Sequence, residues 1–245
     1  MSLASGASVA SSIKEYAFRG LQQLPLVLTA MSLLFTVTTA SISYLNLLLG
    51  FILIIPLYTT LAGSLTEFAL GRFLPGERFS WTRSSGDACR MVPPEGVGSL
   101  SLYESKTTGG TVVPSYWLMN ITFFIGFIVS NLIDTFNTEA APGTDPAAVE
   151  RRMLHATYVA VAFGLFVLAV AVARFRYMPG CEGRGWLGIV LSVVFAAGAG
   201  SIGYGMYTVS RLCGARSSDL LGILSQFVPP SAMGRAPVIC TQSDE

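Results

Sequence analysis

Three polar residues stand inside a stretch of the chain that is otherwise apolar enough to cross a bilayer. Asn120, Asn131 and Asp134 lie within residues 113–137, VPSYWLMNITFFIGFIVSNLIDTFN. In a helix, at about 100° per residue, Asn120 and Asn131 fall on nearly one line, and Asp134 lies about 60° from Asn131. Because hydrocarbon cannot satisfy amide and carboxyl groups, this polar transmembrane face must meet protein or water.

The polar transmembrane face supports two alternatives. It could line a path for an ion or solute, or its amides could hydrogen-bond to neighbouring helices while Asp134 sits at the membrane boundary. We favour the second alternative, because interhelical amide bonds are a common packing device. The apolar runs also contain no Lys, Arg or His that would complete a proton relay. A weak hint of transport is Pro56, which could kink the second run.

Other residue types that carry chemistry do not form an enzymatic pattern. His155 is the only histidine, and the chain has no HExxH, GxSxG or Walker motif. A GxGxxG match at residues 198–203 lies inside an apolar run, where a nucleotide-binding loop has neither its preceding strand nor a solvated crevice. We therefore predict no catalytic residues, no metal ligands, no cofactor and no enzymatic activity.

The same small-residue stretch has a different use in a membrane. Ala196, Ala199, Gly200 and Gly203 include pairs spaced four apart, which let a neighbouring helix approach the backbone closely. We predict that these residues form a helix-packing face and that this face serves oligomerisation.

The four cysteines do not lie deep in the apolar runs. Cys213 and Cys240 are predicted to share one side of the membrane, where a disulfide would pin the tail to the last span in an oxidising compartment. Free thiols are an equally good alternative. Cys89 and Cys181 would share the opposite side. Because no CxxC is present, the spacing does not support a zinc or redox site.

The composition and run lengths indicate which elements carry these residues. The chain is 52% hydrophobic and 12% charged, whereas soluble domains are about 25% charged. Apolar runs long enough to cross a bilayer occupy residues 21–40, 42–65, 116–136, 156–173 and 186–209. The first two form a tight hairpin that turns near residues 38–44. We predict an all-α, polytopic transmembrane bundle of about five spans.

Polar segments divide the chain further. We expect a polar N-terminal segment (1–20), the transmembrane hairpin (21–66), a polar surface loop domain (67–112), three further transmembrane helices (113–210) and a tail (211–245). In the tail, apolar residues from Leu220 to Val228 recur at helical spacing before Pro229, which predicts an amphipathic interfacial helix.

The charge distribution bears on orientation and partners. Ten of the 15 Lys and Arg residues fall on the N-terminal side of the predicted membrane, which makes that side cytoplasmic. The net charge of +1 and the absence of a basic stripe argue against a nucleic-acid partner.

The order of several motifs resembles that of a class of viral proteins. The motifs are TVTTASISYLNLLLGFILIIPLY, GDACRMVPP, VPSYWLMNITFFIGFIVSN and DLLGILSQFVPP, the last followed by Cys240. In this order the chain is similar to small multi-span proteins of nucleocytoplasmic large DNA viruses with an internal virion membrane under an icosahedral capsid. The resemblance covers roughly half of the chain. It implies a viral inner-membrane protein that contacts capsid proteins through its polar loops, and it carries no catalytic residues.

The expected function is structural. We expect an integral membrane protein that anchors a viral inner membrane, or a host-derived one, to capsid or neighbouring membrane proteins. The alternative is a channel or transporter that uses the polar face of the third span. The expected partners are the lipid bilayer, other membrane or capsid proteins, and a homo- or hetero-oligomer.

Overall fold

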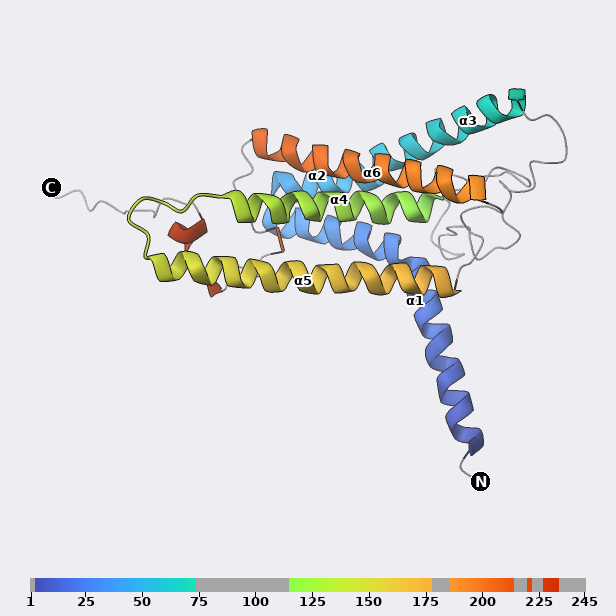
Figure 1. The fold of residues 1–245 in the computed structure, drawn as a ribbon, viewed down its shortest axis with the longest axis horizontal. Helices are drawn as coiled ribbons and strands as arrows, with labels where there is room; N and C mark the ends of the chain where they lie inside the picture. Colours follow the sequence, from blue (N-terminus) through green and yellow to red (C-terminus); the bar gives the residue numbers. More distant parts are fainter. Residues whose placement is uncertain (1–2, 74–114, 178–185, 214–219, 222–226, 234–245) are drawn as a thin grey trace.

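The computed structural model of the chain describes residues 3–73, 115–177, 186–213, 220–221 and 227–233, and these form helices without a strand (Figure 1). The elements are α1 (Leu3–Thr39), α2 (Ile42–Leu49), the π-helical segment η1 (Gly50–Ile54), α3 (Ile55–Phe73), α4 (Tyr116–Asn137), α5 (Pro146–Tyr177), α6 (Trp186–Leu212) and the 3-10 helix η4 (Pro230–Met233). The predicted surface loop domain lies outside the described residues from position 74 to its end at position 112.

The predicted helical membrane bundle is confirmed. Within the described residues, four helical stretches are long and apolar enough to cross a membrane: Ile42–Thr66, Tyr116–Asn137, Pro146–Arg174 and Gly188–Leu212. The first predicted run forms a shorter apolar helix, Gln23–Thr39, within α1. The chain reverses between α1 and α2 at Ala40, whose φ of 48° is left-handed, so the turn falls where the hairpin was expected.

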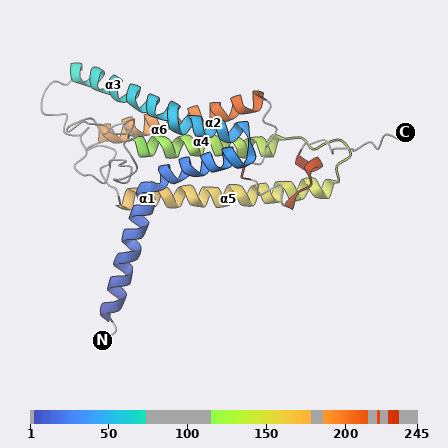
Figure 2. The same cartoon turned by 180° about the vertical axis from the view of Figure 1, so that it is seen from behind.

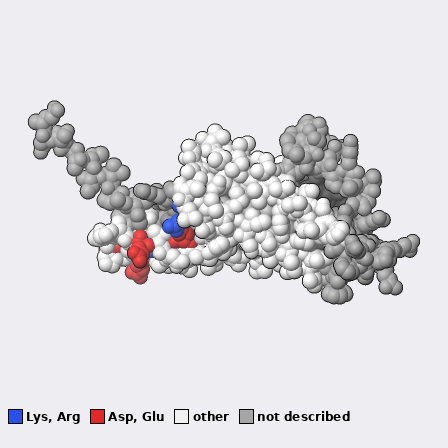
Figure 3. All heavy atoms as spheres, turned by 90° about the horizontal axis from the view of Figure 1, so that it is seen from above, with Lys and Arg blue, Asp and Glu red and all other residues white. Residues whose placement is uncertain are grey.

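The burial of the spans runs opposite to that of a water-soluble protein. α5 contains the most apolar of the four long spans, yet only 6% of its most apolar 18-residue stretch is buried inside the protein. α4 contains the least apolar of these spans, and 56% of the corresponding stretch is buried. In water, the most apolar helix would be the most buried. On the face shown in Figure 3, the visible charged side chains gather at one end and a long uncharged surface follows. Lipid can cover such a surface directly, as in an integral membrane protein.

α4 is the central helix of the bundle. It packs along α6 and also contacts α1, α3 and α5, while α2 contacts α1 and α6 (Figures 1 and 2). α4 and α6 run in the same direction, so both helices end at the same end of the molecule. We call this the tail end, because the described tail residues lie there, and we call the opposite end the amino end.

Glycines bring α4 and α6 into backbone contact. A Cβ on Gly126 would collide with the carbonyl group of Gly200, and one on Gly203 would collide with the carbonyl oxygen of Phe123. Ala199 is fully buried, and Ala196 is buried as well. The small-residue face of α6 therefore packs on α4 of the same chain. The expected use of this face for oligomerisation is wrong, because α4 already covers it.

Aromatic rings fill the core beside this contact. Phe123 and Phe127 of α4 are 0% exposed. Phe123 meets Phe51 edge-to-face with 5.3 Å between ring centroids, and Phe127 meets Tyr207 in the same way at 5.4 Å. Gly50 leaves the space that the Phe123 ring occupies. The core thus consists of aromatic side chains that pack against one another between η1, α4 and α6.

The first two residues of α4 donate hydrogen bonds to carbonyls that prolines in α1 and α3 leave without a helical donor. Proline lacks an N–H, so Pro25 leaves the carbonyl of Leu21 without its helical donor, and the Trp117 indole Nε1 donates to that carbonyl at 2.8 Å. In η1 the amide of Ile55 pairs with the carbonyl of Gly50.

In the same π-helical pattern, the carbonyl of Phe51 would accept from the N–H of residue 56. Pro56 has no N–H, so this carbonyl lacks its helical donor. The hydroxyl of Tyr116 donates to this carbonyl at 3.4 Å. Beyond Pro56, α3 diverges from α4 (Figure 1), as a kink at this proline would require.

Three sequence boundaries are corrected. The surface loop domain was expected from residue 67, but α3 continues to Phe73. The fourth span was expected from residue 156, with residues 137–155 as a connection, but α5 begins at Pro146. Asp145 explains the earlier start, because its carboxylate accepts from the amide of Ala147 at 3.0 Å and a proline suits the first helical position. The polar N-terminal segment is helical from Leu3 and continues into the first apolar run. Most of the predicted tail helix, residues 222–226, lies outside the described residues.

Candidate functional site

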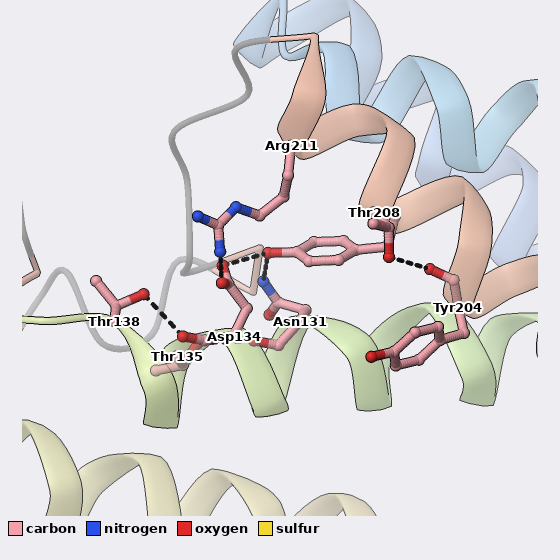
Figure 4. Close-up of polar contacts among 8 residues, drawn as sticks. Asn131, Asp134, Thr135, Thr138, Tyr204, Thr208 and Arg211 are labelled. Atoms are coloured by element: carbon pink, nitrogen blue, oxygen red, sulfur yellow. Dashed lines mark hydrogen bonds and ion pairs between the residues drawn. The ribbon is translucent and has the colours of Figure 1, made fainter.

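Side chains from α4 and α6 meet in one polar cluster at the tail end of the bundle (Figure 4). The Asn131 Nδ2 donates to the Tyr207 hydroxyl at 2.9 Å. That hydroxyl in turn donates to Asp134 Oδ2 at 3.0 Å. The other carboxylate oxygen, Asp134 Oδ1, forms an ion pair with Arg211. We refer to these four residues as the polar cluster.

Helical spacing places the four residues opposite one another. Asn131 and Asp134 are three residues apart on α4, and Tyr207 and Arg211 are four apart on α6, so each pair lies on one face of its helix. A carboxylate in the last turn of a helix is opposed by the helix dipole. Arg211 offsets this effect at Asp134, because its guanidinium lies against the carboxylate.

The polar cluster also holds Leu220, the first described residue after Cys213. The amide of Leu220 donates to Asn131 Oδ1 at 3.4 Å, and the Tyr44 hydroxyl donates to the carbonyl of Leu220. Leu220 is 2% exposed. Both peptide groups of this residue are thus bound by side chains from α4 and α2, and the tail returns into the end of the bundle.

Burial across the cluster changes from the core to the surface. Asn131 and Tyr207 are buried, while the side chains of Asp134 and Arg211 are 10% and 48% exposed. A hydrogen bond between buried groups stabilises the helix contact, whereas an ion pair open to solvent contributes little. The amide–phenol part of the cluster is therefore its stabilising centre.

A second polar link lies between α2 and α6. Asn46 Nδ2 donates to Ser210 Oγ at 2.7 Å, and the Ser210 hydroxyl donates to the carbonyl of Met206 at 2.9 Å. This link continues the polar cluster onto α2. Together these groups join α2, α4 and α6 with side-chain hydrogen bonds.

The predicted polar transmembrane face is divided in the structure. Asn131 and Asp134 share the cluster, but Asn120 lies near the start of α4 and is not part of it. The Asn120 Nδ2 donates to the carbonyl of Tyr116 in its own helix at 2.8 Å. Its Oδ1 is buried without a hydrogen-bond partner among the described residues. Of the three predicted polar residues, only Asn131 and Asp134 therefore bind other helices through their side chains.

Sequence reasoning missed Tyr207 and Arg211. Their four-residue spacing is a usable signal, but Arg211 lies just beyond the predicted last span, residues 186–209. Sequence reasoning also missed Arg152, which is 3% exposed and donates through Nη1 to the carbonyl of Ala232 at 2.6 Å. His155 stacks on Phe227 at 5.1 Å between ring centroids. The tail thus contacts α5 as well as the polar cluster.

The cysteines contribute little to the described site. Cys213 lies just after α6, and its side chain is exposed. Cys240, Cys89 and Cys181 lie outside the described residues, so the pairing of Cys213 with Cys240 stays a prediction. Among the described positions, three or more His, Cys, Asp or Glu side chains do not gather into a group that could hold a metal ion.

No protein-family model, curated protein or solved structure matches the chain.

Proposed function

We propose that the chain is a structural integral membrane protein, which anchors a membrane to neighbouring proteins through its segments outside the bilayer. The polar cluster is the observation that supports this role. Asn131 and Asp134 are the polar residues on which a conduction path would depend, and they bind Tyr207, Arg211 and the peptide group of Leu220. These groups therefore act as helix-joining contacts.

The attachment of the tail supports the anchoring part of the proposal. Leu220 is bound by α4 and α2, and Ala232 is bound by Arg152 of α5. Val228, Ala232 and Met233 also pack on Ala148 and Ala156 of α5. A force applied to the tail by a partner would pass to three helices, as an anchor requires.

The membrane that we propose is the inner membrane of a large DNA virus particle, with capsid proteins and neighbouring membrane proteins as partners. The order of the motifs in the sequence supports this setting. Crosslinking in purified particles tests it, because a partner in the capsid or in the inner membrane would be recovered attached to this chain. Recovery of the chain in host membranes alone would contradict the viral setting.

A flux assay separates the structural role from transport. The intact chain and the Asn131→Leu/Asp134→Leu double variant would be reconstituted into liposomes, with Thr157→Val, on the exposed side of α5, as the matched control. The structural role predicts that all three proteins give the same ion and solute flux as empty liposomes. A flux that the intact chain and the control produce and that the folded double variant lacks would establish transport instead.

Association with partners tests the anchor directly. Removing residues 214–245 deletes the bound tail while leaving α6 complete. We expect this truncation to weaken recovery with crosslinked partners, since the tail is the segment through which the bundle is held. Unchanged incorporation of a folded truncated chain would reject docking by the tail.

A further inference from the structure

We propose that the first part of α1, residues 3–22, is an interfacial helix that lies in the headgroup layer of the bilayer, at the amino end of the bundle. The proposal rests on the bundle spanning a bilayer and is independent of the anchoring role. Its partner is the lipid surface itself.

The length of α1 requires a second environment for this part. α1 has 37 residues, which is about 55 Å at 1.5 Å per residue, against about 30 Å of hydrocarbon. Only Gln23–Thr39 is apolar enough to be counted as a membrane segment. Residues 3–22 therefore extend beyond the hydrocarbon that Gln23–Thr39 occupies.

The direction of α1 changes at the amino end. In both ribbon views its first part leaves the bundle steeply to the side, while its second part runs with α4 (Figures 1 and 2). Pro25 lies in this region of the helix and is fully buried. A helix that leaves a transmembrane bundle sideways at its end runs along the membrane plane and not out into water.

Trp117 holds α1 at the place where the helix changes direction, which we call the corner of α1. Its indole Nε1 binds the carbonyl of Leu21, and its ring stacks under the guanidinium of Arg174, which lies 4.4 Å from the ring centroid. Arg174 also donates to Ser115 Oγ at 3.3 Å. Tryptophan and arginine at the end of a span are typical of the membrane–water interface. The corner of α1 thus lies at the depth of the headgroups.

The sequence of residues 3–22 has the pattern of such a helix. Apolar or small residues recur at three- and four-residue intervals: Val9, Ile13, Tyr16, Ala17 and Gly20. Polar residues recur on a separate set of positions: Ser8, Ser12, Glu15 and Arg19. A helix with one apolar side, a polar side and low overall hydrophobicity lies in the interface plane. Tyr16 is 75% exposed, so its ring is available to the headgroup layer.

Fluorescence quenching in liposomes tests the proposal. In the full chain with its cysteines replaced by serine, single cysteines would be introduced as Val9→Cys, Ile13→Cys, Ser8→Cys and Ser12→Cys and labelled with an environment-sensitive dye. The liposomes would contain phosphatidylcholine and phosphatidylglycerol. We expect lipid-attached quenchers near the headgroups to act severalfold more strongly at positions 9 and 13, and aqueous iodide to act severalfold more strongly at positions 8 and 12.

Two reference positions make every outcome informative. Val161→Cys on the exposed side of α5 reports contact with lipid, and Glu139→Cys between α4 and α5 reports contact with water. Equal quenching by iodide at positions 8, 9, 12 and 13 would show a helix projecting into water. Protection of all four positions from both quenchers would show that protein covers the helix. Either result overturns the interfacial helix, and only loss of lipid quenching at position 161 would also remove the membrane-spanning bundle.

Discussion

α4 and α5 belong to the same bundle, but α4 is surrounded mainly by protein and α5 mainly by lipid. In α4, which carries the amide and carboxyl groups of the polar cluster, 56% of the most apolar stretch is buried inside the protein. In α5, which is more apolar, only 6% of that stretch is buried. In water the relation would be reversed. The amide and carboxyl side chains of α4 thus face protein, while α5, which contains the most apolar span, faces lipid.

The two helices also differ in what holds them. Lipid provides no hydrophobic force between helices, so association depends on close packing and hydrogen bonds. α4 has glycine contacts, stacked rings and the polar cluster along much of its length. α5 is attached chiefly through buried arginines near its two ends, Arg152 to Ala232 and Arg174 to Ser115 and Trp117. Its middle adds an edge-to-face contact between Phe163 and Phe124.

The largest expected difference between the helices comes from removing a large side chain. Phe127→Ala on α4 leaves a cavity among the core rings and should lower the free energy of unfolding by about 3–5 kcal/mol. Leu165→Ala on α5 removes a side chain that is 62% exposed, and lipid fills the space, so we expect little change. Titration with a denaturing detergent measures both. Similar losses for the two variants would remove the distinction between α4 and α5.

Adding one methyl group should have the next largest effect. Gly203→Ala places a Cβ against the carbonyl of Phe123 on α4, so the helices must separate, and we expect a loss of about 2–3 kcal/mol. Gly164→Ala on α5 meets open space and should be neutral or stabilise the chain by up to about 1 kcal/mol. The same unfolding measurement compares them. A neutral Gly203→Ala would mean that α4 and α6 are not in backbone contact.

Removal of the cluster amide should have a smaller effect. Asn131→Leu removes the hydrogen bonds that Asn131 makes with the amide of Leu220 and with the Tyr207 hydroxyl. We expect the free energy of unfolding to fall by about 1–2 kcal/mol. Thr157→Val on α5 removes a hydroxyl that binds only within its own helix, and should be neutral. The unfolding free energies of both variants, with protease sensitivity of the tail as a second readout, check the prediction. An unaltered tail and unaltered stability would show that Asn131 does not hold Leu220.

The smallest expected effect concerns the corner of α1. Trp117→Phe keeps a ring for Arg174 but removes the donor to the carbonyl of Leu21, and should lower stability by about 0.5–1 kcal/mol. Tyr204→Phe removes a hydroxyl from a side chain that is 47% exposed and serves as the control. We also expect a dye at position 13 to become more accessible to iodide in Trp117→Phe alone. Equal accessibility in both variants would remove the role of Trp117 at the corner.

The amino-acid pattern alone predicts a helical membrane protein whose first two apolar runs form a hairpin. It also identified Asn131 and Asp134 as residues that face away from lipid. These properties are readable because transfer of a segment into hydrocarbon depends on the residues of that segment and on hydrogen bonds within its own helix. Asp145 and Pro146 could have marked the true start of α5 in the same way.

Which side chains meet across the bundle becomes clear from the folded chain. Asn131 binds Tyr207, which is 76 positions away, and Leu220, which is 89 positions away. The small residues of α6 could have faced a second copy or another helix, and the structure places α4 against them. Pairing between helices depends on side chains that are distant in the chain and fit only one arrangement of the bundle. The local pattern of any single helix therefore does not contain it.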